Sequence, residues 1–227
     1  MSELNGYSRF PDPHHTTAEG IVCVGGDLSI STLLEAYSKG IFPWPQKGYP
    51  ILWYCPPERG ILEFSDFHIS KSLKKAIRQS QFSFTFDKAF EEVISKCSLA
   101  PRPDQTGTWI LPEMVEAYVL FQKLGFVHSL ECWQGEQLVG GLYGVWVGGV
   151  FMGESMFYKV DNASKACLVA LVEFLQEQGH KWMDIQMVTP LLEQMGGKYI
   201  SRDLFLRRLK EAQTQHPYES IVTFTFP

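Results

Sequence analysis

Residues 138–158, LVGGLYGVWVGGVFMGESMFY, form two apolar runs separated by the pair Gly148-Gly149. Valine and aromatic residues are frequent in both runs, and these residue types favour β-strands. A glycine pair between two such runs is typical of a tight hairpin turn, because glycine adopts positive φ without steric cost. A third run, His128–Trp133, precedes them across Gly135. The sequence therefore predicts a β meander over residues 128–158.

Helical patterns lie on both sides of this meander. A helix is predicted to begin at Asn162, because small and apolar residues recur after it at helical spacing: Ala163, Ala166, Cys167, Ala170, Leu171 and Phe174. The other predicted elements are helices over 69–79, 88–95, 112–124 and 201–213, and strands over 181–188 and 221–226. This order predicts an α+β (mixed α/β) fold.

The first sixty residues have a different composition, rich in proline, glycine and aromatic residues. A short helix is predicted to begin near Ser29 or Ser31 and to end at Gly40, with a strand over Ile51–Tyr54. We therefore predict a small N-terminal domain over residues 1–60 and a larger domain over 61–227.

The composition excludes several classes of protein. Hydrophobic residues make up 45% and charged residues 20% of the 227 residues, which excludes wholesale disorder. The net charge is 20 − 25 = −5, which excludes a uniformly basic nucleic-acid binder. The longest uncharged apolar stretch, 138–153, is shorter than the roughly 18 residues that a membrane span needs. With no secretory pattern at its N-terminus and five scattered cysteines, the chain is predicted to be cytoplasmic, with reduced cysteines.

The first candidate for chemistry is the predicted strand over 181–188. In a strand, alternate side chains share a face, so Asp184 and Gln186 are expected about 6.6 Å apart on one face. An acid and an amide within an apolar strand cost burial free energy unless they are paired or functional. A solvent-facing edge strand, on which both side chains are merely hydrated, is the alternative interpretation.

The second candidate is Glu154, the only charged residue between Glu136 and Lys159. Its carboxylate could bind a cationic group or accept a proton, or it could simply cap local backbone. The surrounding GESMF (153–157) is not a Gly-x-Ser-x-Gly nucleophile elbow, because Phe157 replaces the last glycine. A serine hydrolase is therefore not predicted.

The third candidate is a basic helix face. Lys71, Lys74, Lys75 and Arg78 recur at helical spacing and share one side of the predicted helix. Such a face is either simply hydrated or binds phosphates, and aromatic residues that stack on unpaired bases would favour the second interpretation. Trp44, Trp53 and Trp109 are the candidates, although each of them taken alone is more typical of a core residue.

Two other site types are not predicted. His14 and His15 are adjacent and no other His/Cys pair has ligand spacing, so no metal is expected. Gly25-Gly26-Asp27 lacks the context of a nucleotide-phosphate loop.

Eleven short strings in order resemble one family, the bacterial leucyl/phenylalanyl-tRNA–protein transferases. They are GGDL (25–28), GIFPW (40–44), ILW (51–53), HIS (68–70), GTWI (107–110), EAY (116–118), HS (128–129), VGGLYGV (139–145), GESMF (153–157), NASK (162–165) and DIQ (184–186).

The resemblance implies an enzyme that takes Leu or Phe, and in some members Met, from its charged tRNA. It joins the amino acid to the α-amino group of a protein with N-terminal Arg or Lys, which marks that protein for degradation. No metal or cofactor is implied, because the tRNA ester is already activated. A small N-terminal domain and a C-terminal domain of the GNAT acetyltransferase type are implied. Nothing suggests an obligate dimer, so we expect a monomer.

The resemblance also implies roles for individual residues. Gln186, held by Asp184, would orient the acceptor amine, and Glu154 would meet the cationic acceptor. Trp44 and Trp109 would contact the 3′ adenosine of the tRNA. The walls of the aminoacyl pocket would be Leu142, Phe151, Leu171 and Ile185. The basic face would contact the tRNA backbone through Lys71, Lys74, Lys75 and Arg78.

Two alternatives to this aminoacyltransferase remain at this point. An acyl-CoA-dependent transferase of the same fold would need a pyrophosphate-binding loop, which the stretch Lys159–Asn162 lacks. A non-catalytic RNA-binding module would make no use of Asp184 in chemistry.

Overall fold

The structure is a computed structural model that describes residues 8–101 and 108–216. It contains a three-stranded sheet in the order β1-β3-β2 and a seven-stranded sheet in the order β10-β4-β9-β8-β7-β6-β5. The strands of the small sheet are β1 (Ile21–Val24), β2 (Phe42–Trp44) and β3 (Leu52–Tyr54). Those of the large sheet are β4 (Glu58–Glu63), β5 (Ser83–Phe86), β6 (Val127–Gln134), β7 (Gln137–Val147), β8 (Val150–Tyr158), β9 (Trp182–Gln186) and β10 (Gly197–Ser201).

The predicted meander is confirmed as β6, β7 and β8, which pair antiparallel in sequence order. Gly148 and Gly149 both have positive φ in the turn between β7 and β8, as the hairpin prediction requires. The meander residues alternate between the two faces of the sheet, so each face presents apolar side chains to a different helical layer.

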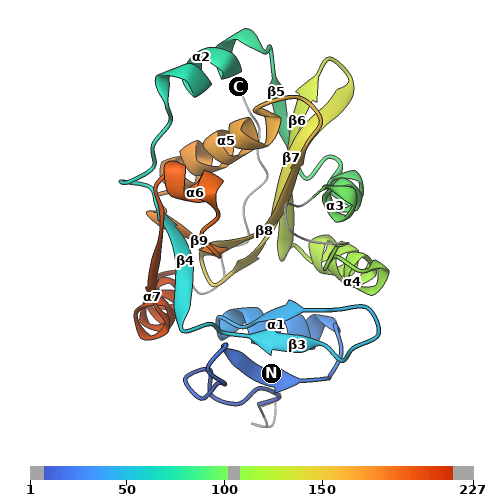
Figure 1. Cartoon of the computed structure of the whole chain (residues 1–227), viewed down its shortest axis with the longest axis vertical. Helices are drawn as coiled ribbons and strands as arrows, with labels where there is room; N and C mark the ends of the chain where they lie inside the picture. Colours follow the sequence, from blue (N-terminus) through green and yellow to red (C-terminus); the bar gives the residue numbers. More distant parts are fainter. Residues whose placement is uncertain (1–7, 102–107, 217–227) are drawn as a thin grey trace.

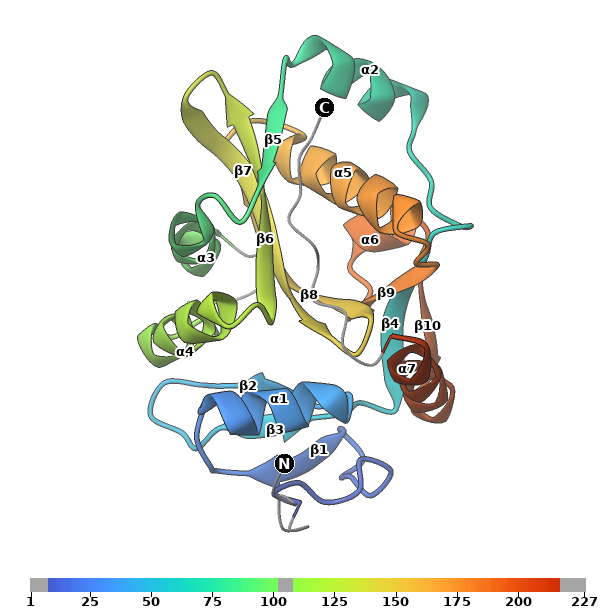
Figure 2. The same cartoon turned by 180° about the vertical axis from the view of Figure 1, so that it is seen from behind.

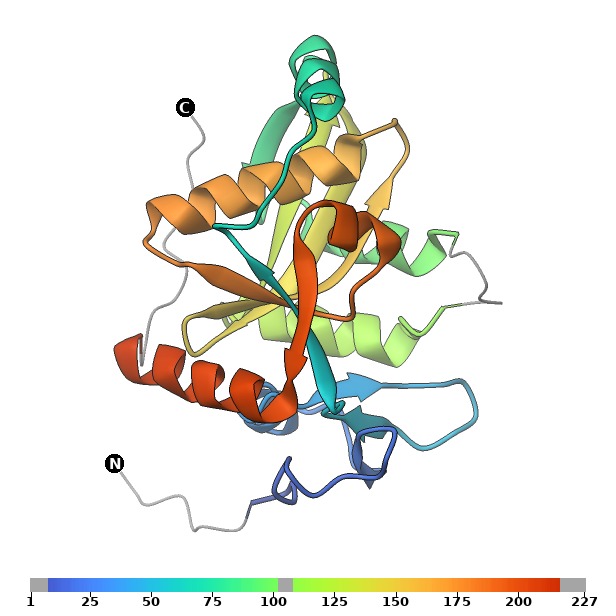
Figure 3. The same ribbon diagram turned by 60° about the vertical axis from the view of Figure 1, so that its left-hand side comes forward.

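Helices cover both faces of the large sheet (Figures 1 and 2). On one side α5 (Ala163–Glu177) lies against β6 and β7, with α2 (Lys71–Gln79) and α6 (Pro190–Gln194) near it. On the other side lie α3 (Phe90–Leu99) and α4 (Pro112–Lys123). Figure 3 shows α5 extended across the sheet and α7 (Arg202–Gln215) below it, following β10.

The helix α5 connects β8 to β9, and these two strands are parallel neighbours in an otherwise antiparallel sheet. The helix is buried along most of its length because it fills the space over the meander. The predicted mixed α/β fold class is confirmed by this arrangement.

Several elements differ from the sequence-based prediction. The strands β1, β2, β4, β5 and β10 and the short helix α6 were not predicted, because each is short and lacks a clear period. The helix expected over 88–95 is α3, which begins and ends later, at Phe90 and Leu99. The strand predicted over 221–226 lies outside the described residues.

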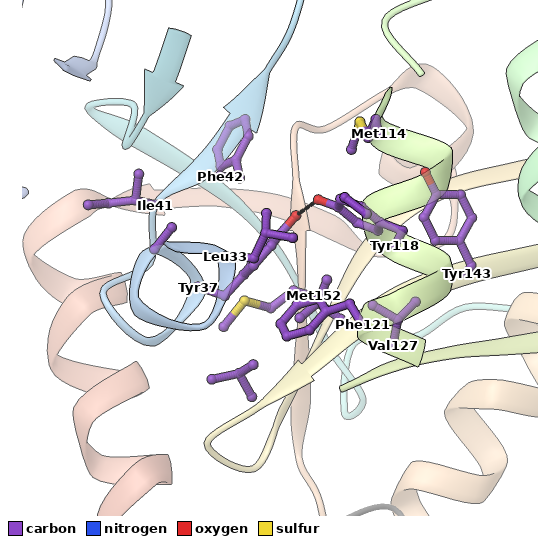
Figure 4. Packing of buried hydrophobic residues seen from close by; sticks show 14 of the residues in the cluster. Leu33, Tyr37, Ile41, Phe42, Met114, Tyr118, Phe121, Val127, Tyr143 and Met152 are labelled. Carbon is purple, nitrogen blue, oxygen red and sulfur yellow. Dashed lines mark hydrogen bonds between the residues drawn. The ribbon is translucent and has the colours of Figure 1, made fainter. Parts of the chain in front are cut away.

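The N-terminal elements pack directly against the rest of the chain. The helix α1 (Ile30–Ser38) ends before Gly40, as predicted, and its Leu33 and Tyr37 share one apolar core with Tyr118 and Phe121 of α4 (Figure 4). The predicted domain boundary between residues 60 and 61 lies within β4, which belongs to the large sheet. Within residues 8–101 and 108–216, no helix has the length and apolar character of a membrane span.

Candidate functional site

An apolar cavity of about 170 Å³ is lined by the middle of β7, by β8 and by β9, and Leu168 of α5 and Leu192 of α6 also line it. This volume is comparable to that of a dry engineered cavity of about 150 Å³ that binds benzene, so it suits one leucine-sized or phenylalanine-sized side chain. Three of the four predicted pocket residues line it, namely Leu142, Phe151 and Ile185.

Leu171 does not line this cavity and is fully buried in the core. The residue of α5 that does line it is Leu168. The two positions are three residues apart, so Leu171 lies about 4.5 Å further along the helix axis, beyond the end of the cavity. Leu168 and the predicted Leu171 lie on the same side of α5, but they belong to successive turns of the helix.

Beside the cavity lies a fully buried ion pair between Arg59 of β4 and Asp184 of β9. Arg59 Nε donates to Asp184 Oδ1 at 2.9 Å and Nη2 to Oδ2 at 2.7 Å. The two side chains are 1% and 0% exposed, which rules out the interpretation of a hydrated edge strand for Asp184. The guanidinium also lies between the rings of Phe42 and Phe205, 4.6 and 4.5 Å from their centroids.

Asp184 positions Gln186 through the backbone of Gln186. The Asp184 Oδ1 atom accepts a hydrogen bond from the Gln186 backbone N–H at 2.9 Å. Gln186 has a φ of 58°, in the left-handed region that non-glycine residues rarely occupy away from functional sites. The extended strand geometry of β9 therefore ends at Gln186. The predicted alternation of side chains between two faces does not continue, because the consecutive residues Ile185, Gln186 and Met187 all line the cavity.

The side chain of Gln186 reaches Glu154 on β8. Gln186 Nε2 donates to Glu154 Oε1 at 2.7 Å, and the Tyr37 hydroxyl donates to the same oxygen at 2.8 Å. Tyr37 is in turn hydrogen-bonded to the Tyr118 hydroxyl (Figure 4). Among the described residues, Glu154 Oε2 has no hydrogen-bond partner. Glu154 therefore belongs to a side-chain network and does not cap the local backbone.

The environment of Glu154 favours its neutral form. Burial raises the pKa of Glu154 to about 7, and the nearby charge of Asp184 also raises it, while hydrogen bonds from Tyr37 and Gln186 oppose the shift. A carboxyl group with a pKa near neutrality can accept and release a proton at physiological pH.

Trp44 and Trp109 line the cavity together and stack on each other, with ring centroids 5.5 Å apart and an interplanar angle of 21°. Both are half-buried, so part of each ring faces solvent. Trp53, by contrast, is buried in the core and takes no part in the site.

The four predicted basic residues are all exposed on α2. Lys71, Lys74, Lys75 and Arg78 form no ion pair with any residue that the structure describes, whereas Leu73 on the opposite face is buried. No residue of α2 lines the cavity, and Figure 1 shows α2 on the opposite side of α5 from β9. In the described ranges, no group of three or more His, Cys, Asp or Glu residues could hold a metal ion.

Besides Leu168, sequence reasoning missed three residues of the ion-pair and hydrogen-bond network, namely Arg59, Tyr37 and Tyr118. The sequence analysis did not single out Arg59, which lies beside a second charged residue, Glu58. The one signal that it could be buried is the apolar pair Ile61-Leu62 that follows it in β4. Nothing in the local sequence marks Tyr37 or Tyr118 as part of a network with Glu154.

Comparison with known proteins identifies the family. The family model for leucyl/phenylalanyl-tRNA protein transferase matches residues 61–210, and the model for its N-terminal domain matches residues 26–57. The chain belongs to the leucyl/phenylalanyl-tRNA–protein transferase family. The predicted resemblance and the prediction of an aminoacyltransferase enzyme are thereby confirmed, against the acyl-CoA and RNA-binding alternatives.

Curated members of the family match along most of their length. A leucyl/phenylalanyl-tRNA–protein transferase of Maridesulfovibrio salexigens is 48% identical over 209 residues, covering 92% of this chain and 87% of the relative. A second, from Flavobacterium johnsoniae, is 46% identical over 88% of this chain and 95% of the relative. Among solved structures, L-PGS from Bacillus licheniformis has a TM-score of 0.39 at 15% identity, covering 65% of this chain and 48% of that one. That likeness supports no conclusion about function.

Proposed function

We propose that this protein transfers Leu or Phe from charged tRNA to the α-amino group of proteins that begin with Arg or Lys. The observation that carries the proposal is the chain of contacts Arg59–Asp184–Gln186–Glu154 at the edge of an apolar, side-chain-sized cavity. A reaction between an amine and an activated ester needs a receptor for the amine and a place for the aminoacyl side chain, and this site supplies both.

In this proposal the aminoacyl side chain occupies the cavity, and the 3′ adenosine lies against Trp44 and Trp109. Aromatic ring faces are suited to an unpaired base, because stacking on them does not depend on duplex structure. An apolar pocket separates side chains that differ by a methylene by only about 1–3 kcal/mol, so slower transfer of Met is expected as well.

Two substitutions on α5 test the position of the pocket. Leu168→Ala enlarges the cavity and is expected to change the ratio of kcat/KM for Phe to that for Leu by about tenfold. Leu171→Ala is the matched control, since it removes the same atoms from the core one turn away and should leave that ratio unchanged. Single-turnover transfer from both charged tRNAs measures it, and an altered ratio in Leu171→Ala alone would refute the assignment.

The chemical step forms one C–N bond and breaks one C–O bond. The acceptor amine attacks the ester carbonyl, the ribose oxygen of the tRNA leaves, and the proton lost by the amine balances the proton gained by that oxygen. Gln186 orients the amine, because an amide is too weak a base to remove the proton. Glu154 takes the proton, since its Oε2 has no partner among the described residues and its pKa lies near 7.

The direct test incubates the protein with labelled Leu-tRNA and a peptide that begins with Arg. Transfer of label by the wild-type protein, and loss of transfer in Asp184→Ala with tRNA binding retained, is the expected result. If Asp184→Ala transfers at the wild-type rate, the chemistry does not lie at β9. If the wild-type protein binds tRNA but transfers nothing, the proposed acceptor is wrong.

The exposed cations of α2 are proposed to contact the phosphates of the tRNA acceptor stem. The KM for charged tRNA is then expected to rise with salt, because each contact releases counterions. Replacing Lys71, Lys74, Lys75 and Arg78 by Gln should reduce the slope of log KM against log salt by about 3–4. Lys123→Gln on α4 is the control and should leave the slope unchanged. A KM that stays flat with salt in the wild-type protein would contradict the proposal.

We also propose that residues 61–227 form a domain of the GNAT type and that residues 1–60 form the small N-terminal domain. The parallel pair β8 and β9 joined by α5 supports the first assignment. The proposal further includes a cytoplasmic, monomeric enzyme without metal or cofactor, whose products are marked for degradation.

A further inference from the structure

A second cavity, of about 540 Å³, adjoins the aminoacyl cavity and is lined by residues of the small sheet, β4 and β10. We name it the acidic groove, and its lining residues are Glu19, Phe42, Trp44, Tyr54, Pro56, Pro57, Glu58, Met187 and Tyr199. Trp44 and Met187 line both cavities. A ligand seated in the groove therefore lies next to the reacting groups.

Both charged side chains that line the groove in the described part of the chain are acidic. Glu19 and Glu58 are its only charged lining residues, both are exposed, and neither forms an ion pair within the described parts of the chain. A hydrogen bond from Thr17 lowers the pKa of Glu19, which keeps this carboxyl ionised at neutral pH. Two unpaired carboxylates disfavour tRNA phosphates and favour a cation.

The walls of the groove are suited to a cation on an alkyl chain. Trp44, Tyr54 and Tyr199 contribute aromatic rings, whose faces attract Arg and Lys side chains. Met187, Pro56 and Pro57 contribute apolar surface that the methylene stem of such a side chain can cover.

The backbone around Met187 fixes the position of this groove relative to Gln186. The residue after Gln186 is Met187, whose backbone N–H donates to the Ile185 carbonyl at 2.6 Å in a tight turn. A Cβ on Gly60 would lie only 2.9 Å from the Met187 carbonyl carbon, so β4 packs closely against that turn. The same strand directs Arg59 into the core and leaves Glu58 exposed on the groove.

We propose that the acidic groove binds the cationic side chain of the acceptor protein's N-terminal residue while its α-amino group reaches Glu154 and Gln186. This inference rests on the proposed function and assigns the acceptor specificity to residues outside the reacting network. Glu154 does not serve both purposes, because it is half-buried and already accepts hydrogen bonds from Tyr37 and Gln186.

The test compares peptides that begin with Arg, Lys or citrulline, the last being a neutral analogue of Arg. In the double variant Glu19→Gln/Glu58→Gln, the KM for the Arg and Lys peptides should rise at least tenfold. The KM for the citrulline peptide and for Leu-tRNA should stay within twofold, and kcat should change little. The control Glu91→Gln/Glu136→Gln removes two exposed carboxylates elsewhere and should leave every KM unchanged.

Calorimetric binding of the Arg peptide to the tRNA-free protein separates the two proposals. Binding that is weakened in the double variant supports the groove even if the wild-type protein transfers nothing, in which case the proposed function alone fails. If the double variant transfers to the Arg peptide with an unchanged KM, the groove does not bind the cationic side chain, and the proposed function still stands. An equal rise in KM for the citrulline peptide would also contradict the proposed role of the groove, because recognition would then not depend on charge.

Discussion

Replacing Arg59 by Gln is expected to lower the free energy of unfolding by about 3–5 kcal/mol and to reduce transfer below detection. The substitution leaves the Asp184 carboxylate fully buried without its partner, which is the costly way to break a buried ion pair. It also removes the group that fixes Asp184, and with it the hydrogen bond that holds the Gln186 backbone at positive φ. Chemical denaturation and the peptide transfer assay measure the two effects.

A paired substitution separates stability from chemistry. Arg59→Met/Asp184→Leu removes both charges, and replacing a whole buried pair by apolar residues is often nearly neutral for stability. Part of the loss should remain, about 1–3 kcal/mol, because the Gln186 N–H then has no acceptor. We expect this variant to be more stable than Arg59→Gln and equally inactive. Recovery of transfer together with stability would show that the pair only supports the fold.

Replacing Glu154 by Gln is expected to reduce kcat about 10²–10⁴-fold with little change in the KM for charged tRNA. The amide keeps the shape of the side chain but cannot take the proton of the attacking amine. In the wild-type protein, kcat should fall as the pH is lowered through about 7, because the carboxyl group becomes protonated there. The variant should lack this inflection while retaining any inflection due to the amine itself, near pH 8. An unchanged inflection in Glu154→Gln would assign the proton to another group.

The raised pKa of Glu154 also makes the stability of the protein depend on pH. Stability should fall as the pH rises, whereas kcat should rise. The pKa of Glu154 is about 7 in the folded protein and near its ordinary value of 4.5 when unfolded, so the folded state binds the proton more tightly. Its contribution to stability is therefore fully present below pH 4.5 and is lost as the pH rises through about 7.

Burial is the main cause of the raised pKa of Glu154, and the neighbouring groups modify it. The like charge of Asp184 raises the pKa further, whereas the charge of Arg59 and the hydrogen bonds from Tyr37 and Gln186 lower it. Tyr37→Phe should raise the pKa of Glu154 further, because it removes a donor to the ionised carboxylate. The inflection in kcat should then move to higher pH, which gives a second readout of the same network.

Much of the fold was predictable because its signals are local. The meander follows from apolar runs interrupted by Gly135 and by the pair Gly148-Gly149, and α5 follows from the spacing of small and apolar residues after Asn162. The strands β4 and β10 were missed because their side chains carry no simple alternation and because they pair with each other across most of the chain. The basic face of α2 was predicted from spacing alone, and all four of its cations are exposed.

The sequence by itself determined the mixed α/β class and the family, and it singled out Glu154, Asp184 and Gln186 as candidates, because short motifs and local periodicity do not depend on tertiary contacts. Only the tertiary structure revealed Arg59 as the partner of Asp184, Tyr37 as a partner of Glu154, and Leu168 in place of Leu171 as a wall of the cavity. The reason is physical. Burial, ion pairing and a shifted pKa depend on groups brought together from distant parts of the chain, and Arg59 and Asp184 are 125 positions apart.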